Sequence, residues 1–152
     1  MTTMKPCGVR VLGTGSAVPE YILGNEELGK EHGVDAEWIE QRTGIIERRI
    51  CSDDEGTFEL QCRALKAALA DTGLKGSDLS LIICATVTAE MTCPSNACRV
   101  AAEVDAKPAG AFDLVAACCG FVYAMNVADC LIRSGQYKTI AALPDELLES
   151  FF

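Results

Sequence analysis

Two adjacent cysteines, Cys118 and Cys119, stand between an apolar run and a segment with helical periodicity, and Gly120 follows them directly. A thiol at a strand-to-helix junction suits nucleophilic chemistry, because the unpaired N–H groups and the dipole of a helix start favour the thiolate. The same junction lies at the carboxyl end of a parallel sheet, where α/β proteins form their clefts. Gly120 would let a bound substrate approach the backbone closely. On these residues alone, a nucleophile and plain packing between sheet and helix are equally good interpretations.

The number and spacing of the cysteines argue against two other uses of thiols. Their count is odd and no C-x-x-C pair occurs, so the sequence predicts no metal site. The start of the chain does not resemble a secretory signal, so a disulfide framework is not expected either. Most of the cysteines are therefore predicted to be small buried hydrophobic residues. The nine cysteines are at positions 7, 51, 62, 84, 93, 98, 118, 119 and 130.

Two further features are weak candidates for chemistry. His32 is the only histidine, and it lies in a polar segment far in sequence from the cysteine pair, so it is a poor candidate for the base that thiol chemistry recruits. The stretch Gly13 to Ser16 reads "GTGS", but Val18 stands where a dinucleotide fingerprint would need its third glycine. A tight turn is the preferred interpretation, and no bound cofactor is expected.

Length and charge restrict the class of protein. The 152 residues are predicted to form one domain, and a formal net charge of −9 disfavours nucleic acid, whose phosphates require a basic surface. No apolar run approaches the roughly 18–20 residues that a membrane-spanning helix needs. The sequence therefore predicts a soluble cytoplasmic protein with no membrane span.

The order of predicted elements favours an α/β fold. Strands are predicted at 9–12, 79–87, 109–118 and 138–143. The strands at 79–87 and 109–118 read as fully buried. Strands alternating with helices predict a mostly parallel sheet with right-handed crossovers. The predicted helices are 26–28 after an Asn25 cap, 35–43, 57–72 after a Thr57 cap, 95–106, and about fifteen residues following Cys118.

Four segments of the chain resemble, in order and spacing, the ketoacyl-acyl-carrier-protein synthase III family of thiolase-like condensing enzymes. They read "VLGTGSAVPE", "EWIEQRTGIIERR", "CPSNAC" and "AFDLVAACCGFVYAMNVADCLIRSGQYK". The resemblance implies that residues 1–152 form the N-terminal half of a thiolase-like α-β-α-β-α sandwich, with the C-terminal half absent. The family's catalytic histidine and asparagine lie in that other half, so the chain alone is expected to be inactive as a condensing enzyme. The final "LPDELLESFF" departs from the family pattern.

The resemblance also implies roles for particular residues. Cys118 corresponds to the acyl-accepting nucleophile, and Cys119 replaces the serine that usually follows it. Trp38 and Arg42 correspond to positions that contact the adenine end of coenzyme A, and a spacing of four places them on one helix face. Cys93 stands where the family often has a phenylalanine, which a dimer partner places at the bottom of the acyl pocket.

The implied function is the initiation of fatty-acid synthesis, in which an acyl-CoA primer is condensed with malonyl-acyl carrier protein. Coenzyme A thioester is the substrate, and no further cofactor is implied. The expected partner is a second copy of the chain or a companion chain carrying the C-terminal half. Two alternatives stay open: a polyketide or hydroxymethylglutaryl-type condensing enzyme using the same cysteine, and a non-catalytic half-domain that acts in assembly. Half a sandwich should also expose an apolar face on the helices that begin near Ser95 and Gly120.

Overall fold

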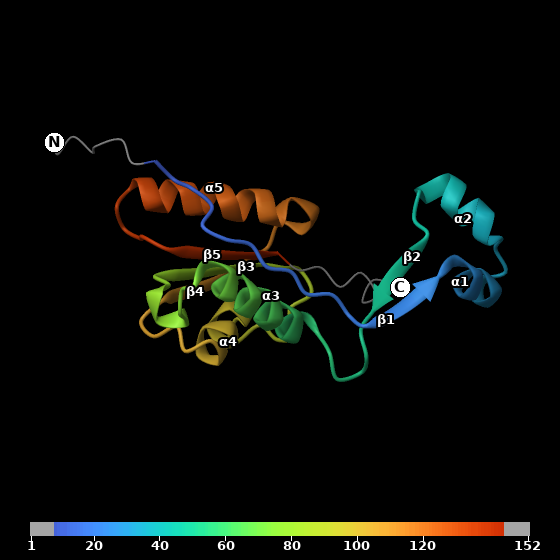
Figure 1. Ribbon diagram of the computed structural model, residues 1–152, viewed down its shortest axis with the longest axis horizontal. Helices are drawn as coiled ribbons and strands as arrows, with labels where there is room; N and C mark the ends of the chain where they lie inside the picture. Colours follow the sequence, from blue (N-terminus) through green and yellow to red (C-terminus); the bar gives the residue numbers. More distant parts are fainter. Residues whose placement is uncertain (1–7, 145–152) are drawn as a thin grey trace. The chain divides into compact units, whose positions relative to one another are not determined.

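The computed structural model describes residues 8–144, and these form two compact units (Figure 1). The larger unit contains residues 8–17 and 57–144, and the smaller unit contains residues 18–56. The sequence predicts one domain and gives no sign of this division. No helix of the described part of the chain is both long and apolar enough to cross a membrane.

A parallel three-stranded sheet forms the centre of the larger unit. Its strands are β3 (Leu81–Ala85), β4 (Gly110–Leu114) and β5 (Ile140–Pro144), in the order β4-β3-β5. Every residue of β3 is buried, as its continuous apolar run predicts. The prediction of a fully buried strand at β4 is wrong: β4 is half-buried, because within residues 8–144 it lies at an edge of the sheet and pairs only with β3.

Helices cover both faces of this sheet (Figure 1). Alternate residues of β3 point to opposite faces. Ile82 and Cys84 pack with α3 (Thr57–Thr72) and α4 (Asn96–Glu103). Leu81, Ile83 and Ala85 instead pack with Ala124 and Ala128 of α5 (Gly120–Arg133). The larger unit is therefore a helix–sheet–helix sandwich, in agreement with the predicted α/β class.

Two of the helix starts predicted in this unit, those at Thr57 and Ser95, have different outcomes. The Ser95 hydroxyl accepts a hydrogen bond from the Cys98 N–H, so the predicted start of α4 is confirmed. Asp113 of β4 adds to this cap by accepting from two further amides at the start of α4. The capping role of Thr57 is wrong, because Thr57 is the first residue of α3 itself; its hydroxyl lies 3.3 Å from the carbonyl oxygen of Thr88.

The smaller unit pairs two short antiparallel strands, β1 (Tyr21–Gly24) and β2 (Glu47–Ile50), with α1 (Asn25–His32) and α2 (Ala36–Thr43). The bounds predicted for α2 are confirmed: the Asp35 carboxylate accepts from the Glu37 N–H, and Gly44 ends the helix with φ +70°. The capping role of Asn25 is wrong. Gly24 occupies that position, and the buried Asn25 side chain donates to the carbonyl of Ile45.

The predicted strand at 9–12 is also wrong, since residues 8–19 form neither helix nor strand. This segment lies against α3 instead. A Cβ atom on Gly15 would be 2.3 Å from both Ala64 O and Ala68 N, and the Thr14 N–H donates to Asp71. The glycines of "GTGS" thus allow close packing on a helix, and the structure shows no turn there.

Candidate functional site

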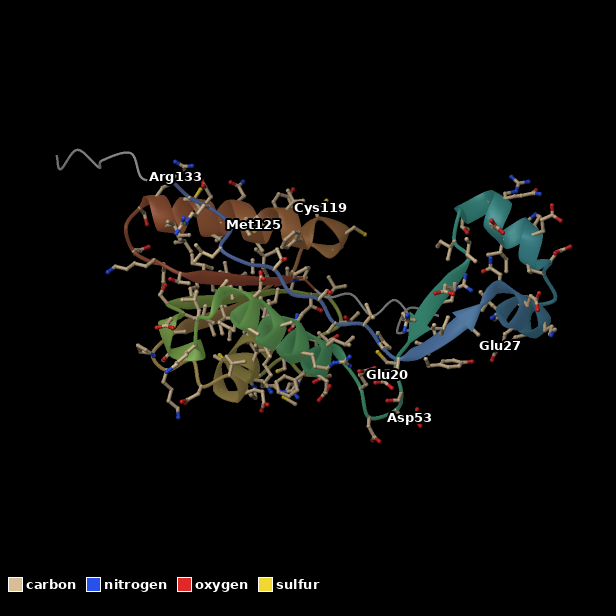
Figure 2. The ribbon with its side chains drawn as sticks, in the orientation of Figure 1. Glu20, Glu27, Asp53, Cys119, Met125 and Arg133 are labelled. Atoms are coloured by element: carbon tan, nitrogen blue, oxygen red, sulfur yellow. The ribbon has the colours of Figure 1, made fainter. Side chains whose placement is uncertain are left out.

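Cys118 lies where the sequence places it, between β4 and α5. Ala117, Cys118 and Cys119 form a short 3₁₀ turn, and α5 begins at Gly120. Ala117 has φ +45°, in the left-handed region that residues with a Cβ rarely adopt. Both thiols are exposed, and Figure 2 shows Cys119 at the start of α5. The junction therefore presents a thiol to solvent at the carboxyl end of a parallel sheet.

Gly120 brings the start of α5 directly onto the central strand. It is buried, and a Cβ atom at this position would lie 3.1 Å from the Cβ of Ala85, the last residue of β3. The glycine therefore has a packing role that fixes the helix start over the strand end. Its predicted contact with substrate stays a prediction.

The remaining cysteines divide by exposure. Burial raises the pKa of the Cys62 thiol to about 11, so this thiol is protonated at neutral pH and is a poor nucleophile. Cys84 is buried as well. The expectation that most cysteines are buried is wrong, because five are exposed within the described residues: Cys93, Cys98, Cys118, Cys119 and Cys130. Residues 8–144 contain no cluster of three His, Cys, Asp or Glu side chains arranged to hold a metal ion.

Cys93 and Cys118 lie at the same edge of the sheet. Cys93 belongs to the loop of residues 86–95, which follows the carboxyl end of β3. Cys118 follows the carboxyl end of β4, the neighbouring parallel strand. Parallel strands end at a common edge, so both cysteines lie beyond the carboxyl ends of neighbouring strands.

Trp38 and Arg42 lie on α2 in the smaller unit and interact with each other. The guanidinium carbon of Arg42 is 5.7 Å from the centre of the Trp38 ring, within the range of a cation–π contact. Trp38 is 52% exposed, so its ring is accessible to a ligand. His32 ends α1 in the same unit and is exposed.

The smaller unit also has a hollow that no sequence pattern indicates. It has a volume of about 800 Å³, and one lysine, Lys30, lies among its acidic residues. Acidic walls disfavour an anionic ligand such as the phosphates of coenzyme A. Neither Trp38 nor Arg42 lines this hollow. Its acidic lining residues are Glu26, Glu27, Glu37, Glu40 and Glu47.

The outer side of α5 exposes an apolar surface near Cys118. Its largest exposed fraction is 68%, at Val122, and Phe121, Tyr123 and Met125 are also exposed. This confirms the apolar face predicted on the helix after Gly120. The corresponding prediction for α4 is wrong, because no large apolar side chain of α4 is exposed within its bounds.

We expect this surface to cause association of the chain. The Val122→Asp variant should have a lower apparent mass than the wild-type chain. An exposed apolar patch favours association that covers it, and a buried aspartate would oppose that association. Light scattering coupled to gel filtration measures the effect. Gln136→Asp adds the same charge at an exposed position beyond the other end of α5 and serves as the control. A wild-type chain that stays monomeric at high concentration would contradict the prediction.

Comparison with known proteins gives a consistent set of relatives. The family model for 3-oxoacyl-[acyl-carrier-protein (ACP)] synthase III matches residues 112–144. The beta-ketoacyl-[acyl-carrier-protein] synthase III of Clostridium acetobutylicum is 44% identical over 140 residues, which cover 92% of this chain and 43% of that protein. The enzyme of the same name from Aquifex aeolicus is 42% identical over 141 residues, which cover 93% of this chain and 45% of that protein.

Solved structures give the same result for the fold. The 3-oxoacyl-[acyl-carrier-protein] synthase III from Aquifex aeolicus VF5 has a TM-score of 0.89 and 42% identity, covering 94% of this chain and 46% of that one. The priming beta-ketosynthase of the R1128 polyketide pathway has a TM-score of 0.88 and 35% identity, covering 90% and 41% respectively. These similarities confirm the thiolase-like fold class. The chain spans less than half the length of the curated relatives that it matches.

Proposed function

We propose, on the premise that this chain belongs to the 3-oxoacyl-[acyl-carrier-protein] synthase III family, that Cys118 accepts an acyl group from a coenzyme A thioester. The observation that supports this most directly is the exposed Cys118 thiol, which stands between an edge strand and the start of α5. The acyl group is then condensed with malonyl-acyl carrier protein, the reaction that initiates fatty-acid synthesis.

The two steps use the same sulfur. In the first, the Cys118 thiolate attacks the thioester carbonyl, a new carbon–sulfur bond forms, and coenzyme A leaves as a thiolate that takes up a proton. In the second, the malonyl group loses carbon dioxide, and the resulting carbanion attacks the acyl carbonyl on Cys118. A carbon–carbon bond forms, and the Cys118 thiolate is released together with a 3-oxoacyl thioester.

The smaller unit would supply part of the coenzyme A site. The Trp38 ring and the Arg42 guanidinium share one face of α2, and together they suit a flat base carrying phosphate groups. The acidic hollow of the same unit is poorly suited to that ligand.

The decarboxylation step needs groups beyond Cys118. The family's catalytic histidine and asparagine are expected in the part of the relatives that this chain does not span. We therefore propose that groups from the part of the relatives that residues 1–152 do not span complete the site. The similarity to the R1128 priming ketosynthase favours one second candidate, the priming of polyketide synthesis by the same chemistry.

Incubation of the 152-residue chain with acetyl-coenzyme A tests the proposed function. We expect intact mass spectrometry to show the slow gain of one acetyl group. Addition of malonyl-acyl carrier protein should give no sustained 3-oxoacyl product, because one thiol does not replace a multi-residue site. The absence of any acetylated cysteine would contradict the assignment of Cys118 as the nucleophile, and continued product formation would contradict the need for groups beyond residues 1–152.

A further inference from the structure

We propose that Glu90 and Arg99 are positioning residues that fix the loop of residues 86–95 on the first turns of α3 and α4. By fixing this loop they set the position of Cys93. If Cys93 lies at the end of the acyl pocket, the position of this loop also affects which acyl chain is accepted. That consequence rests on the proposed function, whereas the fixing of the loop does not.

Glu90 joins the loop to α3. One of its carboxylate oxygens accepts a hydrogen bond of 3.0 Å from the Phe58 N–H in the first turn of that helix. The other carboxylate oxygen pairs with the guanidinium of Arg99 on α4. A negative charge at a helix start also interacts favourably with the helix dipole. A single loop side chain thus contacts both helices.

Arg99 is held by three partners. Its guanidinium pairs with Glu90 and donates to the Asn96 side-chain oxygen at 3.1 Å. Its central carbon also lies 4.0 Å from the centre of the Phe58 ring. A planar guanidinium can make these contacts at once, whereas a lysine ammonium cannot stack on a ring in the same way.

The Glu90–Arg99 pair, which joins the loop to α4, is less exposed to water than the ion pair that joins α3 directly to α4. The side chains of Arg99 and Glu90 are 22% and 33% exposed. Those of Lys66 in α3 and Glu103 in α4 are 53% and 46% exposed. Solvent weakens exposed ion pairs strongly. The Glu90–Arg99 pair is therefore the stronger constraint, and Lys66–Glu103 offers a matched control.

The rest of the loop is anchored on either side of this pair. Before it, the Thr88 N–H donates to the Thr86 hydroxyl, and the Thr57 hydroxyl of α3 lies 3.3 Å from the Thr88 carbonyl oxygen. After it, Ser95 caps α4. Only residues 91–94, which include Cys93, lie between the Glu90 anchor and the Ser95 anchor. Loss of the Glu90 contacts would lengthen that free segment to residues 89–94.

Hydrogen exchange of the 152-residue chain tests the proposal. Glu90→Ala should speed amide exchange several-fold in peptides covering residues 86–95 and at the start of α3, and it should speed alkylation of Cys93 by iodoacetamide. Glu103→Ala removes the exposed pair between the same helices and should leave these rates unchanged. Far-UV circular dichroism checks that each variant is folded.

A second variant keeps the test decisive if Glu90→Ala does not fold. Arg99→Lys retains the charge but loses the stacking on Phe58, so it should speed exchange of the loop by a smaller factor. Wild-type exchange rates in residues 86–95 in a folded variant would overturn the proposal. Acetylation of Cys118 is measured in the same samples. Its absence in the wild-type chain would overturn the proposed function, while the exchange comparison would still decide the role of the Glu90–Arg99 pair.

Discussion

Replacement of Cys118 by alanine is expected to reduce acyl transfer from acetyl-coenzyme A to background, whereas Cys119→Ala should leave the transfer essentially unchanged. The nucleophilic sulfur forms the covalent bond in the proposed reaction, and its removal leaves no atom at that position to accept the acyl group. Intact mass spectrometry followed by peptide mapping measures the acetyl group and locates it. Cys130→Ala removes an exposed cysteine within α5 and is the control for general thiol acylation.

Exposure to solvent does not distinguish the two adjacent thiols, because both Cys118 and Cys119 are exposed. Their backbone positions do differ. Cys119 occupies the N-cap position of α5, whereas Cys118 directly follows Ala117, the residue with φ +45°. Local backbone strain is often found at functional sites. An acetyl group found on Cys119 in the native protein, and absent from Cys118, would contradict the assignment.

Local signals explain which elements could be predicted from the sequence. Asp35 and Gly44 define α2 with contacts inside the helix itself, and Ser95 does the same for the start of α4. β3 was recognisable because a continuous apolar run suits a strand covered on both faces. Each of these signals depends on residues near in sequence.

The errors occur where a distant segment decides the contact. The Thr57 hydroxyl contacts Thr88, 31 residues away, and the Asn25 side chain donates to Ile45, 20 residues away. Neither partner can be inferred from the helix that it affects. The strand β2 reads "ERRI", a short polar stretch without the apolar alternation that predicts a strand.

In the candidate site, too, features set by the order of elements can be predicted from the sequence, whereas tertiary contacts cannot. The place of Cys118 at a strand-to-helix junction follows from the order of elements along the chain. The packing of Gly120 against Ala85 and the Glu90–Arg99 pair are tertiary contacts that no local pattern indicates. The division into two units is likewise a property of long-range contacts.

Replacement of Cys93 by phenylalanine is expected to shift the acyl preference toward short chains. The larger ring would occupy space that the thiol leaves free at the proposed end of the acyl pocket. Each buried methylene contributes about 0.8 kcal/mol, or roughly fourfold in binding. The loss of room for two methylenes would therefore lower the octanoyl-to-acetyl ratio about 15-fold.

The measurement compares acetyl-, isobutyryl- and octanoyl-coenzyme A as primers, with the chain reconstituted with the C-terminal half that its relatives carry. Cys130→Phe adds the same ring at an exposed position near the end of α5 and should not change the preference. Met91 is 41% exposed and lies two residues from Cys93, so its side chain is the nearest in sequence that could refill the space. The Met91→Ala variant tests that refilling. A strong preference for acetyl in the wild-type enzyme that neither Cys93→Phe nor Met91→Ala changes would show that this loop does not limit the pocket.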